Sequence, residues 1–531
     1  MPRTASFLPA HVRALLGPRA YGRAVGSIDL IQTHISYVLL ADDEVYKIKK
    51  AVDLGFADFT TLEKRKAACE AEVRLNRRGC PGDTYLGVVP IVRRGASYRI
   101  GGEGEIVDYA VHMRRLPRER MMDVLLEQDK VDFDMIGRVA ARLAALHREA
   151  ERGPEITRMG GVETLRKNWR DNLGHIRPFI GKTLTLRRFE KLQRFAESFM
   201  QREAQLLRDR EAEGWVRDCH GDLRSDAVCF DPRVPGGICI YDCIEFNDAF
   251  RYSDTGLDAA FLAMDLDYRG RPELSDLFVG LYAAAVGDKR LPLLLDFYKS
   301  YRASVRGKVE SLLLEDPSVS RAQKAGARER AQRYFQLAET YASKRPRRSL
   351  LLVTGPSGTG KSVLAGVLSA RLGSVILSTD MLRRELFETT GEREALDTGK
   401  YAPERREQVY GALERQAEAF LREGRPVVID GTYLERRQRR PVAAMAAETG
   451  VPFLLVECTA PDEVVEARQK RREGETWTTS EGRFEVYLAQ KARREPPDEL
   501  PESQRLAVDT TAPLQAQIRA VLDRLGIGGP D

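Results

Sequence analysis

The chain has 531 residues, which is too long for a single hydrophobic core and predicts two or three domains. It contains 85 lysine and arginine residues against 79 aspartate and glutamate residues, and its formal net charge is +6. This nearly even balance argues against a dedicated nucleic-acid-binding protein, which would gather its basic residues on one face. No apolar run approaches the roughly 18 residues of a membrane span, and the N-terminal segment lacks the apolar core of a signal peptide. We therefore expect a cytoplasmic protein without a membrane partner.

Two patterns of secondary structure follow each other along the chain. The first begins with short strand-like runs and continues as a long helical region; the runs are 38–40, 45–48, 88–92 and 106–113. In the second, strands alternate with helical segments, and the candidate strands are 350–354, 375–378, 426–429, 453–457 and 506–508. Apolar strands that alternate with helices are typical of a parallel sheet buried on both faces. The basic segment 343–349 between the two patterns is interpreted as a solvated linker, and the alternative is a functional basic patch.

The first half contains a set of residues suited to phosphoryl transfer. A histidine-glycine-aspartate sequence ends at Asp222, and Asp242 follows at a distance of twenty positions. An aspartate in such a loop can orient a substrate hydroxyl and accept its proton, and a second aspartate can ligate Mg²⁺. Lys47 and Lys49 lie two positions apart, on one face of a predicted strand. Glu72, on the next helix, is a candidate ion-pair partner for this lysine.

This pattern resembles the aminoglycoside phosphotransferase-like kinases over roughly residues 30–340. The resemblance implies a bilobal, protein-kinase-like fold of the α+β class in a domain at 1–342, with an N-lobe at about 1–116 and a helical C-lobe at about 117–342. It also implies that Asp222 is catalytic, that Asp242 binds the metal ion, and that Lys47 or Lys49 pairs with the α- and β-phosphates of a nucleotide.

One position departs from the pattern of that family. The pattern places an asparagine, a ligand of the second Mg²⁺, five residues after the catalytic aspartate, and this chain has Ala227 there. Three readings stay open: the first half uses one metal ion, it recruits the adjacent Asp226, or it binds nucleotide without transferring phosphate. His220 is interpreted as a brace of the loop, and Asp254 and Asp258 as further candidate braces.

The seven cysteines are predicted to be reduced thiols. Their number is odd, their density is low and their neighbours are apolar. Four of them lie near His220, at Cys219, Cys229, Cys239 and Cys243, but their spacing differs from that of paired zinc ligands. Thiols packed in the core are therefore favoured over a zinc site.

The second half contains a complete P-loop at 355–362, with the sequence G-P-S-G-T-G-K-S. An apolar strand-like run precedes it and a helix-compatible run follows it, as the motif requires. Glycines let backbone N–H groups approach phosphate oxygens, and the helix N-terminus adds a positive dipole. Lys361 is expected to reach the β- and γ-phosphates, and the Ser362 hydroxyl to ligate Mg²⁺. The predicted nucleotide-binding residues are Gly355, Ser357, Gly358, Thr359, Gly360, Lys361 and Ser362.

Two aspartates follow the next strands of this half. Asp380 comes after the strand 375–378, at the end of a parallel sheet that opens into the active-site crevice. It can accept the proton of an attacking hydroxyl while Arg383 holds an acceptor anion; the alternative is that Asp380 caps the following helix. Asp430 ends the strand 426–429 and is predicted to act as a carboxylate of the Mg²⁺ site.

An arginine-rich segment before Gly474 resembles a lid. Arg468 and Arg472, with Arg471 between them, are candidates to neutralise charge on the transferred group; the alternative is a solvated helix face. Together with the P-loop and the two aspartates, the segment resembles P-loop kinases of the gluconate kinase, zeta-toxin and polynucleotide kinase type. The resemblance covers about 180 residues and implies an α/β P-loop kinase domain at 350–531.

Both halves thus indicate a kinase that uses Mg²⁺ and ATP or GTP. We expect the main active site in the second half and a small-molecule hydroxyl, of a sugar or an aminoglycoside-like polyol, as the acceptor. One alternative is a kinase of nucleoside or polynucleotide 5′-hydroxyls, although a nucleic-acid end is not the favoured partner. The other is a nucleotide-binding regulator whose N-terminal module is a pseudokinase.

Overall fold

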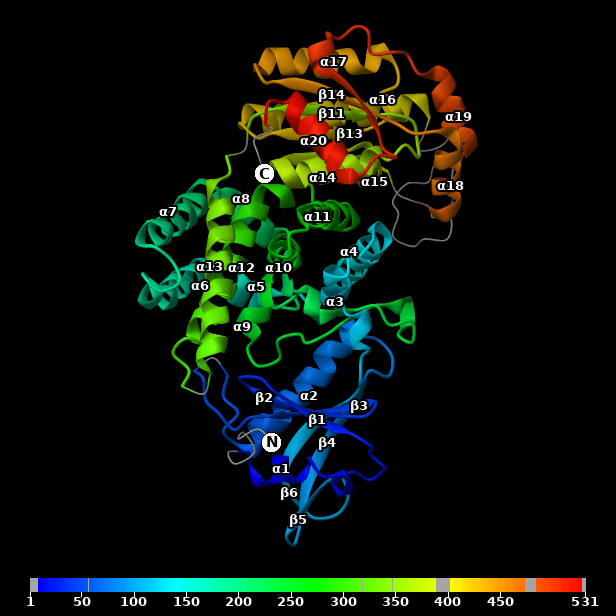
Figure 1. The fold of residues 1–531 in the computed structure, drawn as a ribbon. Coiled ribbons are helices and arrows are strands. Elements are labelled where there is room, and N and C mark those ends of the chain that lie inside the picture. Colours follow the sequence, from blue (N-terminus) through cyan, green and yellow to red (C-terminus); the bar gives the residue numbers. More distant parts are fainter. Residues whose placement is uncertain are drawn as a thin grey trace. The chain divides into compact units, whose positions relative to one another are not determined.

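The computed structural model describes residues 8–55, 57–317, 319–345, 347–387, 402–472 and 484–527. The chain forms two compact units, each made of several chain segments (Figure 1). Unit 1 contains the segments 1–132, 145–168 and 205–258. Unit 2 contains the segments 133–144, 169–204 and 259–531, so the basic segment 343–349 lies inside it.

Unit 1 contains a six-stranded antiparallel sheet with the strand order β1-β2-β3-β6-β4-β5. Its strands are β1 Ile28–Gln32, β2 Ser36–Ala41, β3 Glu44–Lys49, β4 Tyr85–Arg94, β5 Ser97–Ile100 and β6 Glu105–Arg114. All four strand-like runs predicted for this part of the chain lie inside observed strands. Helix α2 (Leu62–Gly79) packs against β4 and β6, while the short α1 (Ala10–Ala14) and η2 (Pro18–Ala20) lie near β5.

The rest of unit 1 is built from short elements around the loop that carries Asp222. Strands β7 and β10 pair antiparallel, and so do β8 and β9. The strands are β7 Val216–Asp218, β8 Val228–Cys229, β9 Cys239–Ile240 and β10 Tyr252–Asp254. The helices are η3 Arg118–Arg120, α3 Met122–Glu127, α5 Pro154–Gly160, α8 Ala204–Ala212, η5 Ser225–Ala227, η6 Pro235–Gly237 and α9 Asp248–Arg251.

The prediction that all cysteines are reduced is wrong for one pair. Cys80, after α2, and Cys239, in β9, form a disulfide across a sequence separation of 159 residues. The other five cysteines are free and buried, as expected for thiols in the core.

Unit 2 contains a five-stranded parallel sheet with the order β12-β13-β11-β14-β15. Its strands are β11 Leu350–Thr354, β12 Val375–Ser378, β13 Val427–Asp430, β14 Phe453–Thr459 and β15 Arg505–Asp509. Each overlaps one of the five predicted strands. The elements between and after them are α14 Lys361–Leu372, α15 Thr379–Leu386, α16 Pro403–Arg422, α17 Arg436–Thr449, α18 Asp462–Arg472, α19 Phe484–Arg493, η8 Glu502–Gln504 and α20 Leu514–Arg524.

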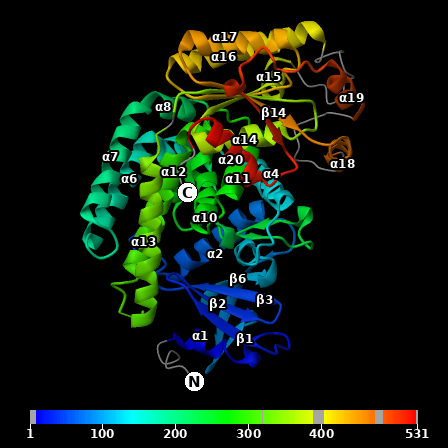
Figure 2. The same cartoon turned by 45° about the horizontal axis from the view of Figure 1, so that its top comes forward.

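Helices cover both faces of this sheet, which explains why its strands are continuously apolar. Residues of α16 and α17 form one apolar cluster with the sheet, and residues of α14 and α20 form the other. Figure 2 shows the two helical layers on opposite sides of the strands. The parallel-sheet prediction for this part of the chain is confirmed.

A helical layer of unit 2 packs against the outer face of α14. Its helices are α7 Leu186–Arg202, α11 Pro272–Val286, α12 Leu291–Leu312 and α13 Arg321–Ser343, with η4 Arg177–Phe179. Helices α4 Phe133–Glu149, α6 Val162–Ile176 and α10 Thr255–Tyr268 each have residues that belong to unit 1 and residues that belong to unit 2. Helix α11 crosses α14 where Gly280 faces Gly366, and the amide of Ile376 in β12 donates to the carbonyl of Lys289 at 3.1 Å. No helix in the described part of the chain is both long and apolar enough to span a membrane.

Candidate active sites

The P-loop lies between β11 and α14, as the sequence predicts. Three of its glycines have positive φ angles: 141° at Gly355, 86° at Gly358 and 90° at Gly360. At Gly358 a Cβ would come within 2.7 Å of side chains of α18, and at Gly355 within 2.6 Å of a backbone oxygen. A side chain is excluded at both positions on steric and conformational grounds. Helix α14 begins with Lys361 and Ser362, directly after the loop.

Neighbouring elements hold the P-loop from outside. Thr510, after β15, donates through its hydroxyl to the Thr359 carbonyl at 2.7 Å. Arg468 of α18 donates to the hydroxyl and to the carbonyl of Thr510, both at 2.8 Å. Burial lowers the pKa of Arg468, and the charge of Arg471 lowers it further. In this structure Arg468 is therefore a support of the loop, while the Arg472 side chain and Gly474 lie outside the described residues.

A contact that the sequence did not reveal lies on the same loop. The backbone N–H of Ser357 donates to the Gln490 carboxamide oxygen of α19 at 2.7 Å. On the other side of the loop, Gln469 donates to the Ser357 carbonyl at 3.4 Å. Gln490 belongs to no recognisable motif, so only the tertiary packing of α19 could have shown its position.

The parallel pairing of β12 and β13 brings the predicted polar residues together. Ser378 and Asp430, the last residues of the two strands, are direct register partners. The Ser378 hydroxyl donates to Asp430 Oδ2 at 3.1 Å and accepts from the Asp380 N–H at 3.3 Å. Ser378 is thus the cap of α15, and the alternative in which Asp380 caps this helix is wrong. Asp380 Oδ1 instead accepts from Arg383 Nη1 at 2.6 Å.

The environment of Asp430 suits a bound cation. Its Oδ1 atom is buried and accepts no hydrogen bond within the described part of the chain. Burial raises the pKa of Asp430, the charge of Lys361 opposes this, and Asp380 raises it further. A buried carboxylate oxygen without a donor is costly unless a cation or a proton compensates it. Asp430 and the adjacent Ser362 therefore fit the oxygen ligands that Mg²⁺ prefers.

In unit 1 the two predicted lysines share the predicted glutamate. Lys47 Nζ lies 2.8 Å from Glu72 Oε1 and 2.7 Å from Asp242 Oδ1. Lys49 Nζ lies 2.5 Å from Glu72 Oε2 and also pairs with Glu245. The charge of Lys47 lowers the pKa of Asp242 to about 2, so this carboxylate is ionised at neutral pH.

The two lysines differ in access. The Lys49 side chain is fully buried, whereas 14% of the Lys47 side chain is exposed. The side chain of its partner Asp242 is 58% exposed. Only Lys47 keeps a path to an incoming phosphate. Sequence reasoning missed Glu245, although it lies only three positions after Asp242.

The loop of Asp222 is held by hydrogen bonds from behind. Asp258 accepts from the N–H groups of His220 and Gly221, at 3.0 and 2.8 Å, and lies 3.1 Å from His147 Nε2. The ring of His220 lies 2.9 Å from the Tyr241 carbonyl, beside Asp242. The expected bracing by His220 and Asp258 is confirmed. The side chains of His147, Cys219 and Asp258 are all buried and lie close together, and the hydrogen bonds of Asp258 serve to hold the loop.

Arg224 occupies the space between the two acidic residues of the loop. Its guanidinium lies 3.4 Å from Asp222 Oδ1 and 2.9 Å from Asp226 Oδ2. Ala227 is buried in η5 and offers no ligand atom. Asp226 is therefore paired with the Arg224 cation, and the neighbouring Ala227 cannot supply a metal ligand.

One family model agrees with the assignment of the C-terminal domain, and relatives and solved structures with similar sequences are also found. A family model described as an AAA domain, AAA_33, matches residues 350–497. The uncharacterized protein Rv2004c of Mycobacterium tuberculosis strain H37Rv is 33% identical over 470 residues, which cover 88% of this chain and 90% of that protein. Among solved structures, a gluconokinase from Sinorhizobium meliloti is 22% identical over 34% of this chain and 94% of that one, with a TM-score of 0.28. A choline/ethanolamine kinase family protein from Mesorhizobium loti is 14% identical over 59% of this chain and 93% of that one, with a TM-score of 0.34.

Proposed function

This chain belongs to the same family as the mycobacterial protein Rv2004c, and we propose that it is a phosphotransferase with its main active site at the P-loop of unit 2. In this proposal it transfers the γ-phosphate of ATP or GTP to a hydroxyl of a small molecule, such as a sugar or an aminoglycoside-like polyol. The supporting observation is the strand register that brings Ser378 and Asp430 together, with Asp380 two residues after Ser378 and Lys361 acting on the charge of Asp430.

Each residue has a step to perform. Lys361 and the N-terminus of α14 hold the β- and γ-phosphates. Mg²⁺, when bound by Ser362 and Asp430, supplies charge that offsets the charge of the phosphates. The acceptor oxygen forms a bond to the γ-phosphorus, the bond from that phosphorus to the leaving ADP oxygen breaks, and Asp380 takes the acceptor proton. Arg383, which now binds Asp380, can turn its guanidinium to an anionic group of the acceptor.

The test measures acceptor-dependent ADP or GDP formation by the full chain. Sugars, aminoglycosides, nucleosides and 5′-hydroxyl oligonucleotides are screened with ATP and with GTP. We expect Lys361→Ala and Asp380→Asn to lower turnover by about 10² to 10⁴-fold, the range for loss of a positioned acid–base group. The matched control is Asp509→Asn, because Asp509 also ends a strand of this sheet but bonds only to Thr511 in the described residues.

Three outcomes would contradict parts of the proposal. Unchanged turnover in both variants would exclude the P-loop as the main site. Labelled 5′ ends in oligonucleotides, without transfer to small molecules, would favour the polynucleotide alternative. Nucleotide binding without turnover with every acceptor would favour a regulator.

A second candidate site is supported by the ion pairs of unit 1. The link from Lys47 to Glu72 and Asp242 is the arrangement that holds nucleotide phosphates in protein-kinase-like sites, while Arg224 and Ala227 leave the second metal position without a free ligand. We propose that unit 1 binds nucleotide here. Lys47→Ala should then weaken ATP binding in the presence of Lys361→Ala. If Asp222→Ala abolishes transfer and Lys361→Ala does not, unit 1 is the main catalytic site instead.

A further inference from the structure

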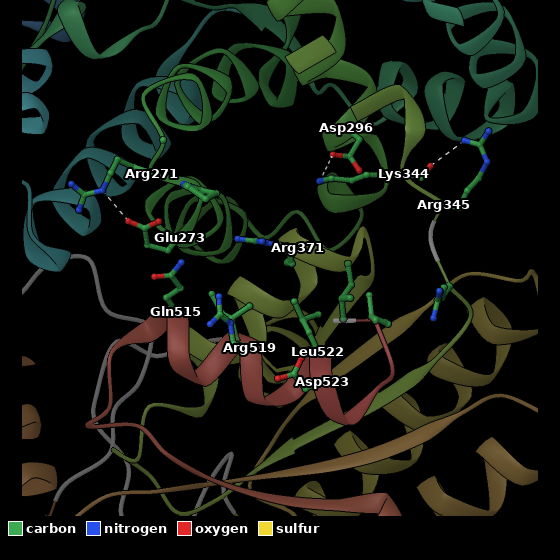
Figure 3. A pocket seen from close by; sticks show the side chains of 16 residues that line it. Arg271, Glu273, Asp296, Lys344, Arg345, Arg371, Gln515, Arg519, Leu522 and Asp523 are labelled. Atoms are coloured by element: carbon green, nitrogen blue, oxygen red, sulfur yellow. Dashed lines mark hydrogen bonds and ion pairs between the residues drawn. The ribbon is translucent and has the colours of Figure 1, made fainter. Parts of the chain in front are cut away.

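Unit 2 contains a cavity of about 960 Å³ that the proposed reaction does not use. Five segments line it: the start of α11, Asp296 of α12, the basic segment after α13, the last residues of α14, and α20 with the residues that follow it. In Figure 3 the α20 residues Gln515, Arg519 and Asp523 face the side that carries Arg271 and Glu273. A cavity of this size lies within the range of roughly 300 to 1,000 Å³ that is common for small-molecule sites.

The cavity lies at the opposite end of α14 from the P-loop. Lys361 and Ser362 are the first residues of this helix, whereas Arg371 and Leu372, which line the cavity, are its last. At 1.5 Å per residue the two ends are about 15 Å apart along the axis. A ligand here would therefore be separate from the nucleotide at the P-loop.

The lining carries an excess of positive charge. Six lining side chains are cationic and three are anionic, which leaves an excess of three positive charges. The cations are Arg271, Lys344, Arg345, Arg347, Arg371 and Arg519, and the anions are Glu273, Asp296 and Asp523.

Two of the lining carboxylates form an ion pair with a lining cation, and the third follows a lining cation by four residues on the same helix. Arg271 Nε lies 3.0 Å from Glu273 Oε1, and Lys344 Nζ lies 2.8 Å from Asp296 Oδ1. Asp523 is four residues after Arg519 on α20, the spacing at which opposite charges compensate each other on a helix.

Arg371 is neutralised by a residue outside the lining. Its Nε atom lies 2.5 Å from Oδ2 of the buried Asp276. After these four cations are balanced, the remaining positive charge resides on Arg345 and Arg347.

These two arginines have only backbone partners within the described residues. Arg345 Nη1 donates to the Lys344 carbonyl at 3.1 Å, and Arg347 Nη1 donates to the Gly526 carbonyl at 2.9 Å. A carbonyl satisfies one N–H group but does not neutralise a guanidinium, which has five such donors. Both side chains are exposed, and both residues belong to the basic segment that the sequence predicts to be a solvated linker.

We propose that this cavity binds a small phosphorylated anion through Arg345 and Arg347. A phosphate or pyrophosphate group offers several acceptor oxygens and two or more negative charges, which match two guanidiniums that lack a counter-charge. The apolar side chains Leu372, Ile518, Leu522 and Ile527 also line the cavity and can contact the remainder of the molecule. The basic segment then acts as part of a ligand site rather than as a linker alone.

The test uses inorganic pyrophosphate as the probe and the full chain as the protein. Equilibrium dialysis gives the affinity and the number of sites for the wild type and for Arg345→Gln/Arg347→Gln. The matched control is Arg348→Gln, because Arg348 belongs to the same segment and donates to the Leu421 carbonyl at 3.0 Å but does not line the cavity. Since the P-loop also binds phosphates, each protein is compared in a Lys361→Ala background as well.

We expect one class of sites to weaken by at least about tenfold in the double variant and to stay within about twofold in the control, because hydrogen bonds to charged groups are lost only in the first. Pyrophosphate should also slow hydrogen exchange in α20 of the wild type and not of the double variant, a readout that needs no catalytic activity. Equal binding by the double variant and the control would overturn the proposal. Equal competition by sulfate at matched ionic strength would also overturn it, because the site would then be an unselective anion sink.

Discussion

The contact between α11 and α14 gives a graded stability prediction. A Cβ placed on Gly280 would lie 2.6 Å from the carbonyl carbon of Gly366, whereas a Cβ on Gly366 would lie 3.1 Å from the Cα of Gly280. Gly174, exposed on α6, has no atom within 4 Å of its Cβ position. Replacing each glycine by alanine therefore adds the same methyl group at three positions that differ in how close the nearest neighbouring atom lies.

The magnitudes follow from two opposing effects. Alanine is favoured over glycine inside a helix by about 1 kcal/mol. At Gly280 both partners are helix backbone, so the helices have to separate by about 1 Å to reach normal contact, and overpacking of this kind costs up to about 3 kcal/mol. We expect Gly280→Ala to destabilise unit 2 by about 2 kcal/mol, Gly366→Ala to be close to neutral, and Gly174→Ala to stabilise by up to about 1 kcal/mol.

Hydrogen exchange measured by mass spectrometry is the suitable assay. A chain of two compact units does not have to unfold in one transition, and peptides from α11 and α14 report directly on the contact. Exchange in these peptides should accelerate in Gly280→Ala and remain unchanged in Gly174→Ala. If Gly280→Ala is as stable as Gly174→Ala, α11 and α14 do not approach each other as closely as they do in this structure. The packing of the helical layer against the P-loop domain would then also have to be revised.

Three further predictions concern single groups. Asp430→Asn should remove Mg²⁺-dependent transfer but raise the melting temperature of the nucleotide-free protein. Burial raises the pKa of Asp430, so the wild-type protein loses stability as the pH rises above about 4. The difference in melting temperature between the variant and the wild type should therefore grow over the same pH range. Gln490→Ala should strengthen ATP binding in calorimetry by up to about tenfold, since it frees the Ser357 N–H, whereas Gln490→Glu should weaken binding by placing a negative charge beside the phosphates. Reduction of the Cys80–Cys239 disulfide should lower the unfolding free energy of unit 1 by at most about 5 kcal/mol, as closure of a loop of this length implies, and Cys80→Ser should be insensitive to reductant in the same urea titration.

The sequence was sufficient to predict a feature wherever a local residue pattern alone determines that feature of the fold. The five strands of unit 2 are short apolar runs between helices, and the P-loop has its glycines at the positions where the structure has positive φ angles. The same holds for Asp430, which lies beside Ser378, two residues before Asp380, because residues at the carboxyl ends of neighbouring parallel strands lie side by side. In unit 1, Glu72 could be assigned to a lysine from the family resemblance, and the structure places it beside both Lys47 and Lys49.

The sequence did not predict contacts between residues that lie far apart in the chain, because several residues of the same type could have made each contact. Cys80 could have paired with any of six cysteines, and nothing local selects Cys239. Arg468 has the charge of a lid arginine, yet its two hydrogen bonds to Thr510 depend on where β15 ends. Glu245 and Gln490 are ordinary polar residues until the fold places them beside Lys49 and Ser357.

The composition of unit 2 shows why the P-loop domain should not be considered apart from the preceding helices. Leu293 of α12 packs against the apolar cluster on the α16 and α17 face of the sheet. On the other side, Gly366 lies in the middle of α14 and is covered by α11, while Arg371 at its end pairs with Asp276. Helix α14 therefore joins three features: the phosphate-binding loop at its start, the helical layer along its side, and the basic cavity at its end. A shift of this helix along its axis would therefore move all three features together.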